Sequence, residues 1–185
     1  CNGGMMVTDD EELLERAQLL RNHAMVTPDE SLAYVYDVVD IGSKYDMSEL
    51  DAAYILGQLA KQDAAIARQQ EIAAKYTQRL SGAAHITLPE MVDDHTFSLY
   101  IIKVKKNRDS FARELLDKGI ETGLHYIPLH LLSYYKSKYS LRVNDFPVAL
   151  RNFQQVLSIP IYADMSDADV DYVCDTIIDI TKHWV

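Results

Sequence analysis

The segment "GSKYDM", residues 42–47, carries the residue types of a small anion site. Gly42 and Ser43 permit a tight, sterically open turn, and Lys44 adds a full positive charge. A helix that begins just after this turn would offer free backbone N–H groups, where phosphate commonly binds. The segment is not a P-loop, because GxxxxGK[ST] is absent from the chain, and GxGxxG is absent as well. The spacing therefore predicts a phosphate contact at Lys44, with a solvated lysine in a surface turn as the alternative.

A second chemical cluster lies in "GLHYIPLHLLSYY", residues 123–135. His125, Tyr126 and His130 gather around a proline, with two tyrosines close behind. Two histidines five positions apart across a proline cannot share a helical face, which excludes a zinc site of the HExxH type. An aromatic loop with histidines can hydrogen-bond the hydroxyls of a sugar and stack on its ring. The alternative is a packed loop whose polar groups find partners within the protein.

Composition and charge narrow the remaining classes of function. The chain of 185 residues is 48% hydrophobic and has a formal net charge of -10, which disfavours a nucleic-acid partner. Lysine and arginine are scattered, and no apolar run approaches the roughly 20 residues of a membrane span. Cys1 and Cys174 lie far apart with no CxxC, which favours reduced thiols over a disulfide or a metal pair. We expect a soluble cytoplasmic protein with no metal site. The GxSxG elbow of many hydrolases is absent, so the sequence does not suggest a hydrolase.

The elements that would position Lys44 begin with a short apolar strand, "MMVT", which ends at Thr8. Thr8-x-x-Glu11 predicts a capping box for a helix over about residues 9–22. Residues 24–45 read as a loop that contains a short β-like piece, "VYDVVDI".

A second capping box, Ser48-x-x-Asp51, opens a helical stretch that runs to about residue 80. This stretch is too long for one average helix, so a bend is expected near residues 61–63. Its second part should bury one edge, formed by Ile66, Ala73, Tyr76 and Leu80.

The composition changes at "SGAAHITLPE", residues 81–90, and we place a domain boundary there, between 1–80 and 81–185. Strands are expected at "FSLYIIKV" and "IETGLHY", and a helix over about 109–118 should end at Gly119. Pro147 suits the first turn of a helix that runs to about residue 157. Ser166-x-x-Asp169 caps the last helix, whose inward stripe comprises Val170, Val173, Ile177 and Ile180. The pattern predicts an α/β protein.

Taken in order, four segments resemble one family, the PLP-dependent sugar aminotransferases of the DegT/DnrJ/EryC1/StrS type. "NGGMMVTDDEELLERAQLLRNHA" is similar to the strand and helix that follow the family's cofactor lysine. "YDVVDIGSKYDMSELDAAYILGQLAKQD" is similar to its G-x-N/K-x-R/N-M/L segment and the next helix. "GIETGLHYIPLHLLSYY" and "VLSIPIYADMSDADVDYV" resemble its last two signatures, and the matches stay collinear from residue 3 to about 173.

The resemblance implies the C-terminal half of a fold-type-I aminotransferase, that is, the end of the large domain (1–80) and the small domain (81–185). It also implies pyridoxal 5'-phosphate as cofactor and transfer of an amino group, typically from glutamate, to a nucleotide-linked keto-sugar. Such an activity would serve surface polysaccharide or glycan assembly. In the family, the loop matching 42–47 crosses a homodimer interface to the partner's cofactor phosphate, which implies cofactor contacts from Ser43, Lys44 and Tyr45. His125, Tyr126 and His130 match the loop that helps to wall the sugar site.

The chain departs from the family at several positions. Many members carry Arg where Asp46 stands, and a carboxylate pointing inward would repel the phosphate. We therefore expect Asp46 to face away from the phosphate or to serve the start of the helix. The family's G-E-G-G is here Cys1-Asn2-Gly3-Gly4, and its Gly after R-x-H is Ala24.

No catalytic residue is assigned in this chain, because the family's imine-forming lysine is expected upstream of Cys1. Lys44 comes from the wrong element of the fold to replace it. The chain alone is therefore expected to be inactive and to need a complementary N-terminal half. Two other interpretations stay open: a non-catalytic half that keeps only its partner-binding surfaces, and the branch of the family that dehydrates sugars with a histidine in place of the lysine.

Overall fold

The computed structural model describes residues 3–28, 31–32 and 34–184. The chain divides into two compact units, an N-terminal unit, Cys1–Lys61, and a C-terminal unit, Gln62–Val185. The sequence placed the domain boundary at 80–81 instead. The division falls earlier because the helix that begins at Gln62 packs against the last helix of the chain. How the two units map onto the domains of a complete enzyme stays a prediction.

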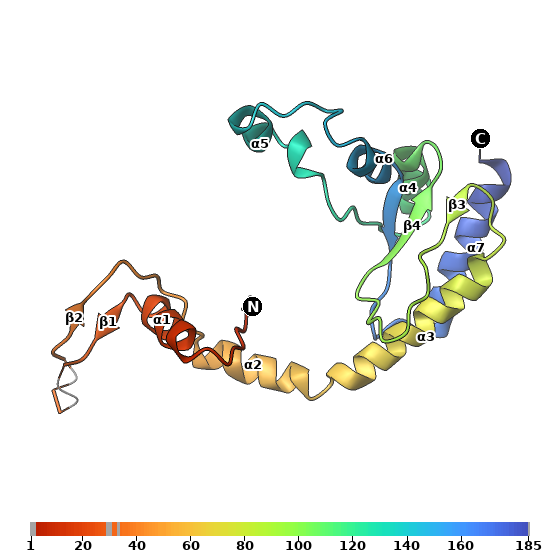
Figure 1. Ribbon diagram of the computed structural model, residues 1–185. Helices are drawn as coiled ribbons and strands as arrows, with labels where there is room; N and C mark the ends of the chain where they lie inside the picture. The colour runs from red at the N-terminus through yellow and green to blue at the C-terminus, as the bar shows by residue number, and fades with distance from the viewer. Residues whose placement is uncertain (1–2, 29–30, 33, 185) are drawn as a thin grey trace. The chain divides into compact units, whose positions relative to one another are not determined.

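The N-terminal unit contains two helices and a minimal hairpin, which Figure 1 shows in red to light orange. Its elements in chain order are α1 (Glu11–Arg21), β1 (Met25–Val26), β2 (Asp37–Val38) and α2 (Glu49–Leu59). The strands β1 and β2 pair antiparallel, with Met25 opposite Val38. The strand predicted at "MMVT" is wrong, because no described segment pairs with residues 5–8.

The two predicted helix starts of this unit differ in outcome. The Asp10 carboxylate accepts a hydrogen bond from the Leu13 backbone N–H at 3.0 Å, so Asp10 is the N-cap of α1. The capping box predicted at Thr8 is wrong, since the Thr8 hydroxyl accepts from the Asp10 backbone N–H instead. The start of α2 is confirmed, because the Ser48 hydroxyl accepts from the Asp51 backbone N–H at 3.1 Å. The helical stretch is interrupted close to the predicted bend, because α2 ends at Leu59 and the next helix begins at Gln62.

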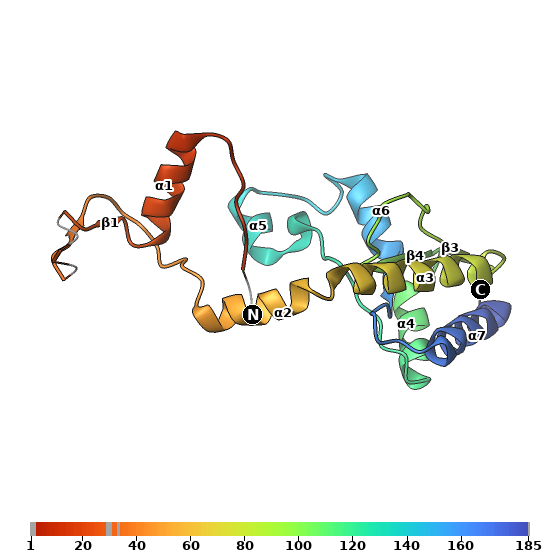
Figure 2. The same ribbon diagram turned by 90° about the horizontal axis from the view of Figure 1, so that it is seen from below.

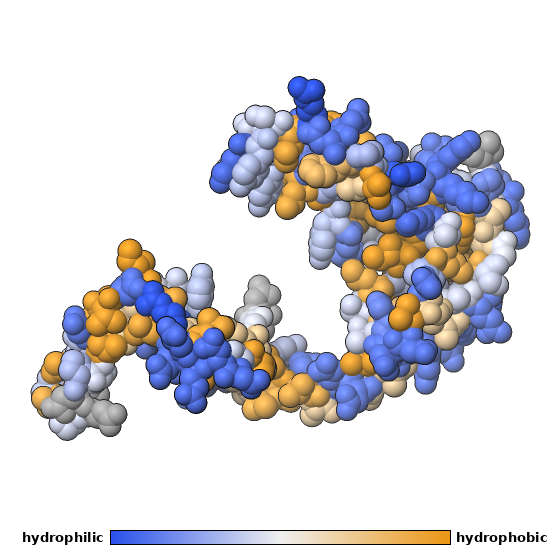
Figure 3. All heavy atoms as spheres, viewed as in Figure 1, coloured by the Kyte–Doolittle hydropathy of each residue, from blue (hydrophilic) through white to orange (hydrophobic). Residues whose placement is uncertain are grey.

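The N-terminal unit has almost no core of its own. Among its described apolar residues, Ala24 alone is buried. Figure 3 shows apolar residues at the surface along α2. The most exposed large apolar side chains of the unit are Met5, Val7, Tyr34, Ile41, Tyr45 and Leu50. A unit of this size normally buries about 60% of its unfolded surface, so this one needs a covering partner to be stable.

The C-terminal unit is built on a three-stranded antiparallel sheet in the order β3-β4-β5. Its strands are β3 (Ile86–Thr87), β4 (Tyr100–Val104) and β5 (Val156–Ile159), with Tyr100 opposite Ile159. Its helices are α3 (Gln62–Leu80), α4 (Arg108–Asp117), the short η1 (Leu129–Leu131), α5 (Ser133–Lys138), α6 (Pro147–Gln155) and α7 (Asp167–His183). Figures 1 and 2 both show α7 alongside α3.

The core of this unit lies between α3, α4, α7 and the sheet. Tyr76 and Tyr100 are fully buried with their ring centroids 5.2 Å apart, and Phe111 packs edge-on against Trp184. All four residues of the predicted inward stripe of α7 are buried, as are three of the four predicted on α3, the exception being the half-buried Ile66. The helix pattern therefore identified the buried faces correctly.

Ion pairs also join α3 to α7. Arg68 contacts Asp167 at 2.8 Å, Lys75 contacts Asp171 at 3.0 Å, and Arg79 contacts both Asp171 and Asp175. The basic residues of these pairs all lie on α3 and the acidic residues all lie on α7. Exposed ion pairs add little stability, so their main effect is to fix the register of the two helices.

Several predicted element boundaries of this unit hold. Ser166 and Asp169 form the expected capping box, Pro147 occupies the first turn of α6, and Gly119 follows α4 with a φ of 77°. The strand predicted at "IETGLHY" is wrong, since it makes one isolated bridge, between Gly123 and Ser158. The helix expected to reach 157 ends at Gln155, because the next residues pair with β4 as β5.

Candidate functional site

The turn that carries Lys44 is bonded to the end of α1. The Tyr45 backbone N–H donates to the Arg21 carbonyl at 2.8 Å, and the Ser43 N–H donates to the Leu20 carbonyl at 2.8 Å. The Ser43 carbonyl accepts from the His23 N–H at 3.0 Å. Lys44 is thus held between two anchored neighbours, and its side chain alone is free to move.

Gly42 makes this arrangement possible. A Cβ atom at position 42 would lie 2.3 Å from the Ala24 backbone nitrogen and 2.5 Å from the His23 carbonyl carbon. Neither atom can move aside, because both belong to the backbone. Position 42 therefore accepts glycine only, and the reason is the close approach of two backbone segments.

The Lys44 ammonium is paired with Asp46. Its Nζ lies 3.1 Å from both oxygens of the Asp46 carboxylate, and the two side chains are 68% and 44% exposed. The hydrogen bond from Lys44 is the main reason that the pKa of Asp46 lies below its ordinary value. The expectation that Asp46 faces away from the phosphate or serves the helix start stays a prediction, and in the structure the Asp46 carboxylate contacts Lys44.

A cavity of about 800 Å³ opens beside this pair, within the N-terminal unit. Lys44, Tyr45 and Asp46 line it together with Arg21 and the Gly3-Gly4 segment, whereas Ser43 is not among its lining residues. The N–H groups of Ser43 and Tyr45 are already bonded, so the phosphate contact predicted here rests on cationic side chains rather than on backbone donors. The exposed ammonium of Lys44 at the cavity fits one contact to a cofactor phosphate.

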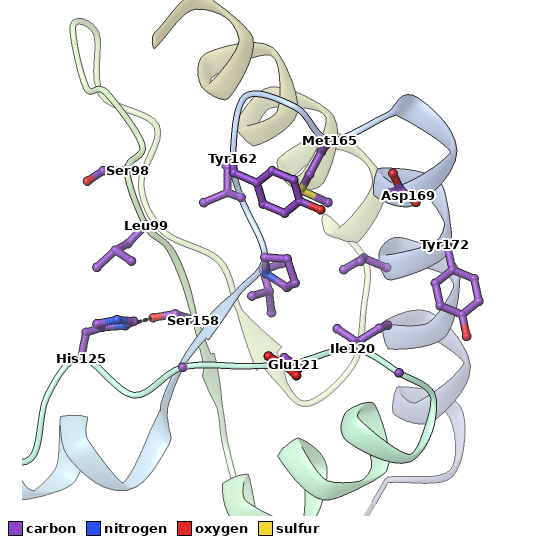
Figure 4. Close-up of a pocket in the computed structure, with 16 residues that line it drawn as sticks. Ser98, Leu99, Ile120, Glu121, His125, Ser158, Tyr162, Met165, Asp169 and Tyr172 are labelled. Atoms are coloured by element: carbon purple, nitrogen blue, oxygen red, sulfur yellow. Dashed lines mark hydrogen bonds between the residues drawn. The ribbon is translucent and has the colours of Figure 1, made fainter. Parts of the chain in front are cut away.

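The second predicted cluster divides in the structure. His125 lines a different cavity, of about 570 Å³, in the C-terminal unit, and its Nδ1 lies 2.8 Å from the Ser158 hydroxyl (Figure 4). Its ring lies over Gly123, where a Cβ atom would come within 2.7 Å of His125 Cε1. Ser158 itself is buried, so this hydrogen bond fixes the imidazole at one end of the cavity.

Tyr126 and His130 do not line that cavity. Tyr126 is 77% exposed, with its ring edge-on to His125 at a centroid distance of 4.9 Å. His130 is buried with its ring 5.0 Å from that of Phe146, and its Nε2 has no hydrogen-bond partner among the described residues. The structure therefore brings His125 and Tyr126 together, whereas His130 packs against Phe146 and its predicted substrate contact stays a prediction.

The rest of the His125 cavity is apolar and acidic. Figure 4 shows Glu121 on the segment before Gly123, Tyr162 on the loop after β5, and Asp169 and Tyr172 on α7. None of the lining residues is Lys or Arg. Such a lining suits a neutral, hydroxyl-bearing ring better than an anion. Sequence reasoning missed Ser158 and Glu121, and the apolar run that contains Ser158 gave no polar signal.

Other classes of site are absent from the part of the chain that the structure describes. No three His, Cys, Asp or Glu residues there could hold a metal ion together. No described helix is long and apolar enough to cross a membrane. Cys174 is a free, buried thiol, and its burial raises its pKa to about 11, so the reactive thiolate does not form at neutral pH. Cys1, the other thiol considered in the sequence, and Asn2 lie outside the described residues.

Comparisons with known proteins identify the family of the chain. The model of the DegT/DnrJ/EryC1/StrS aminotransferase family matches residues 1–178. SpsC of Bacillus subtilis strain 168, a spore coat polysaccharide biosynthesis protein, is 33% identical over 193 residues, covering 97% of this chain and 50% of SpsC. The chain thus spans about half the length of the curated relatives it matches.

Solved structures give the same result. Spr1654 of Streptococcus pneumoniae in its PLP form has a TM-score of 0.84 at 27% identity, covering 97% of this chain and 46% of that one. DesV of S. venezuelae, solved with a ketimine intermediate, has a TM-score of 0.83 at 27% identity over 97% of this chain and 47% of DesV. The expected fold class, α/β and part of a fold-type-I aminotransferase, is confirmed. Pyridoxal phosphate as the family's cofactor is confirmed too, since Spr1654 is also known in a PMP form.

Proposed function

The chain belongs to the DegT/DnrJ/EryC1/StrS aminotransferase family, and from that premise we propose that it forms part of a sugar aminotransferase that depends on pyridoxal phosphate. The complete enzyme would move an amino group, typically from glutamate, to a nucleotide-linked keto-sugar in the assembly of a surface polysaccharide or glycan. The observation that carries the proposal is the position of Lys44, at a cavity and in the turn that matches the family's phosphate loop.

When bound, the cofactor supplies an electron sink for the exchange of the amino group. The residues of this chain bind the cofactor and the substrate. Lys44 neutralises the cofactor phosphate of a neighbouring copy in a homodimer, with Tyr45 beside it at the same cavity. His125, held by Ser158, hydrogen-bonds a hydroxyl of the sugar, and the exposed Tyr126 offers its ring face to the same substrate.

No Lys or Arg lines the His125 cavity, which supports a sugar contact there and a phosphate contact at Lys44. Acidic and aromatic groups there favour the uncharged ring of the substrate, whereas its nucleotide phosphates must be bound elsewhere. Lys44 and Arg21 both line the other cavity, which suits it to the phosphate of the cofactor.

The proposal is tested by adding pyridoxal phosphate and a nucleotide-linked keto-sugar to the chain, with and without a complementary N-terminal half. The absorption band of the lysine-bound cofactor should appear only when that half is present, and an aminated sugar should form. A dehydrated sugar in place of the aminated one would support the dehydratase branch instead.

A second candidate, a non-catalytic partner-binding half, is favoured by the nearly coreless N-terminal unit. It predicts a stable complex of the two halves with no cofactor band. The same mixture therefore distinguishes the aminotransferase from the non-catalytic half, because complex formation and cofactor binding are measured independently.

A further inference from the structure

The only carboxylate that contacts Lys44 among the described residues is that of Asp46, two positions further along the chain. Both oxygens of the Asp46 carboxylate accept from the Lys44 ammonium at 3.1 Å. Asp51, which lines the same cavity, is engaged differently, because its carboxylate accepts from the Ser48 hydroxyl at 2.8 Å. Asp46 is therefore the group that any incoming anion must displace.

The backbone around the pair makes this contact a built feature of the turn. Ser43 and Tyr45 are hydrogen-bonded to the end of α1, and Gly42 fits against His23 and Ala24 without room for a side chain. These contacts fix the backbone on both sides of Lys44. Lys44 and Asp46 both line the same cavity, so the ion pair lies where an incoming anion would meet the ammonium.

We propose that Asp46 is an internal counter-ion that occupies Lys44 in the free protein and lowers its affinity for a phosphate group. The proposal rests on the phosphate role of Lys44 proposed above. The family segment has Arg or Asn at this position, so the competing carboxylate distinguishes this chain from that pattern. A phosphate that captures Lys44 must break the ion pair and then remain close to an unpaired like charge.

The expected size of the effect follows from the exposure of the pair. An ion pair between two partly exposed side chains contributes a factor of roughly 1.4 to 5 to an equilibrium constant. The like charge that remains near the phosphate adds to this in the same direction. Replacing Asp46 by the neutral, nearly isosteric Asn should therefore tighten phosphate binding about two- to fivefold.

The test is a titration with inorganic phosphate, at constant pH and ionic strength, of the chain assembled with its complementary N-terminal half in the absence of pyridoxal phosphate. The signal is the NMR chemical shift of the Lys44 side chain, with the summed shift of the neighbouring amides as a second readout for variants that lack Lys44. The variants are Asp46→Asn, Lys44→Ala and their combination. The control is Glu15→Gln, which removes one exposed negative charge from the same unit at a position that does not line the cavity.

Asp46→Asn should bind phosphate two- to fivefold tighter than the original chain, and Glu15→Gln should differ by less than 1.5-fold. In the Lys44→Ala background, Asp46→Asn should tighten binding less than it does with Lys44 present, because only the like-charge repulsion is then removed. If Asp46→Asn and Glu15→Gln are equal with Lys44 present, the counter-ion proposal is overturned, whereas a loss of binding in Lys44→Ala would still support the proposed function. If Lys44→Ala binds phosphate as well as the original chain, both proposals fail.

Discussion

Replacing Tyr76 with Phe tests whether a single buried hydrogen bond holds α3 to the loop after β5. The Tyr76 hydroxyl donates to the Pro160 carbonyl at 2.8 Å, and the Tyr76 side chain is fully buried. Pro160 and its neighbours line the His125 cavity, so this bond supports one wall of it. The substitution removes the donor and little else, because the phenyl ring can keep its contact with Tyr100.

The expected cost is about 1–2 kcal/mol of the free energy of unfolding, since the fully buried Tyr76 loses its hydrogen bond to the half-buried Pro160 carbonyl. Trp184, the only tryptophan, packs on Phe111 and reports unfolding of the C-terminal unit by its fluorescence in urea. The matched control is Tyr172→Phe. Its hydroxyl donates to the Lys118 carbonyl, also at 2.8 Å, but the side chain is 53% exposed, so water can replace the bond.

Tyr172→Phe should therefore change the free energy of unfolding by less than about 0.5 kcal/mol. Equal losses in the two variants would refute the reasoning, because burial would then not decide the cost. A loss below about 0.5 kcal/mol in Tyr76→Phe would refute it as well.

Four further results are expected. Burial raises the pKa of Cys174 from 9.0 to about 11, so the thiol loses its proton at a lower pH in the unfolded chain than in the folded one. The contribution of this thiol to the free energy of unfolding is therefore fully present below pH 9 and should fall by about 1 kcal/mol by pH 10. Cys174→Ala should reduce that loss in a comparison of urea midpoints. Arg79→Ala should cost about 1 kcal/mol in low salt and less in high salt, whereas Lys182→Ala, which removes an exposed pair, should cost nothing measurable in the same denaturation assay. In the assembled enzyme, Lys44→Ala should weaken retention of pyridoxal phosphate by about 1–3 kcal/mol, measured from cofactor release on dilution; unchanged retention would make Lys44 an ordinary surface lysine. The chain by itself should bind a hydrophobic dye and self-associate through the apolar side chains of α2, and a dye-free monomer in sedimentation would contradict this.

The sequence predicted best what depends on near neighbours along the chain. The Ser166 capping box, the stripe of α7 and the glycine after α4 all involve residues within a few positions of each other, and the structure contains each of them. The cap of α1 shows the limit of such rules. Asp10 and Thr8 are both good N-caps, and the choice between them depends on where the helix begins in space.

What depends on distant partners was harder to predict. "MMVT" has the composition of a strand, yet a strand forms only where another one pairs with it. β5 is the opposite case. Its four residues have the pattern of a helix end, but they form a strand because β4 pairs with them. The candidate sites follow the same rule: the contact of His125 with Ser158 joins residues 33 positions apart, which no local pattern reveals.

The charge of Asp46 posed a different problem. A cofactor phosphate would repel its carboxylate, whereas the Lys44 ammonium attracts it and lies 3.1 Å away. Two opposite charges two positions apart in a fixed turn are each other's nearest partners, so the ion pair could have been foreseen from the sequence.

The tight fit at Gly42 has a consequence for engineering this protein. The junction between the end of α1 and the lysine-bearing turn depends on a hydrogen atom where every other amino acid has a carbon. A mutagenesis library intended to retune ligand preference should therefore keep codon 42 constant and vary positions 43, 45 and 46. Diversity at codon 42 would fill the library with misfolded members.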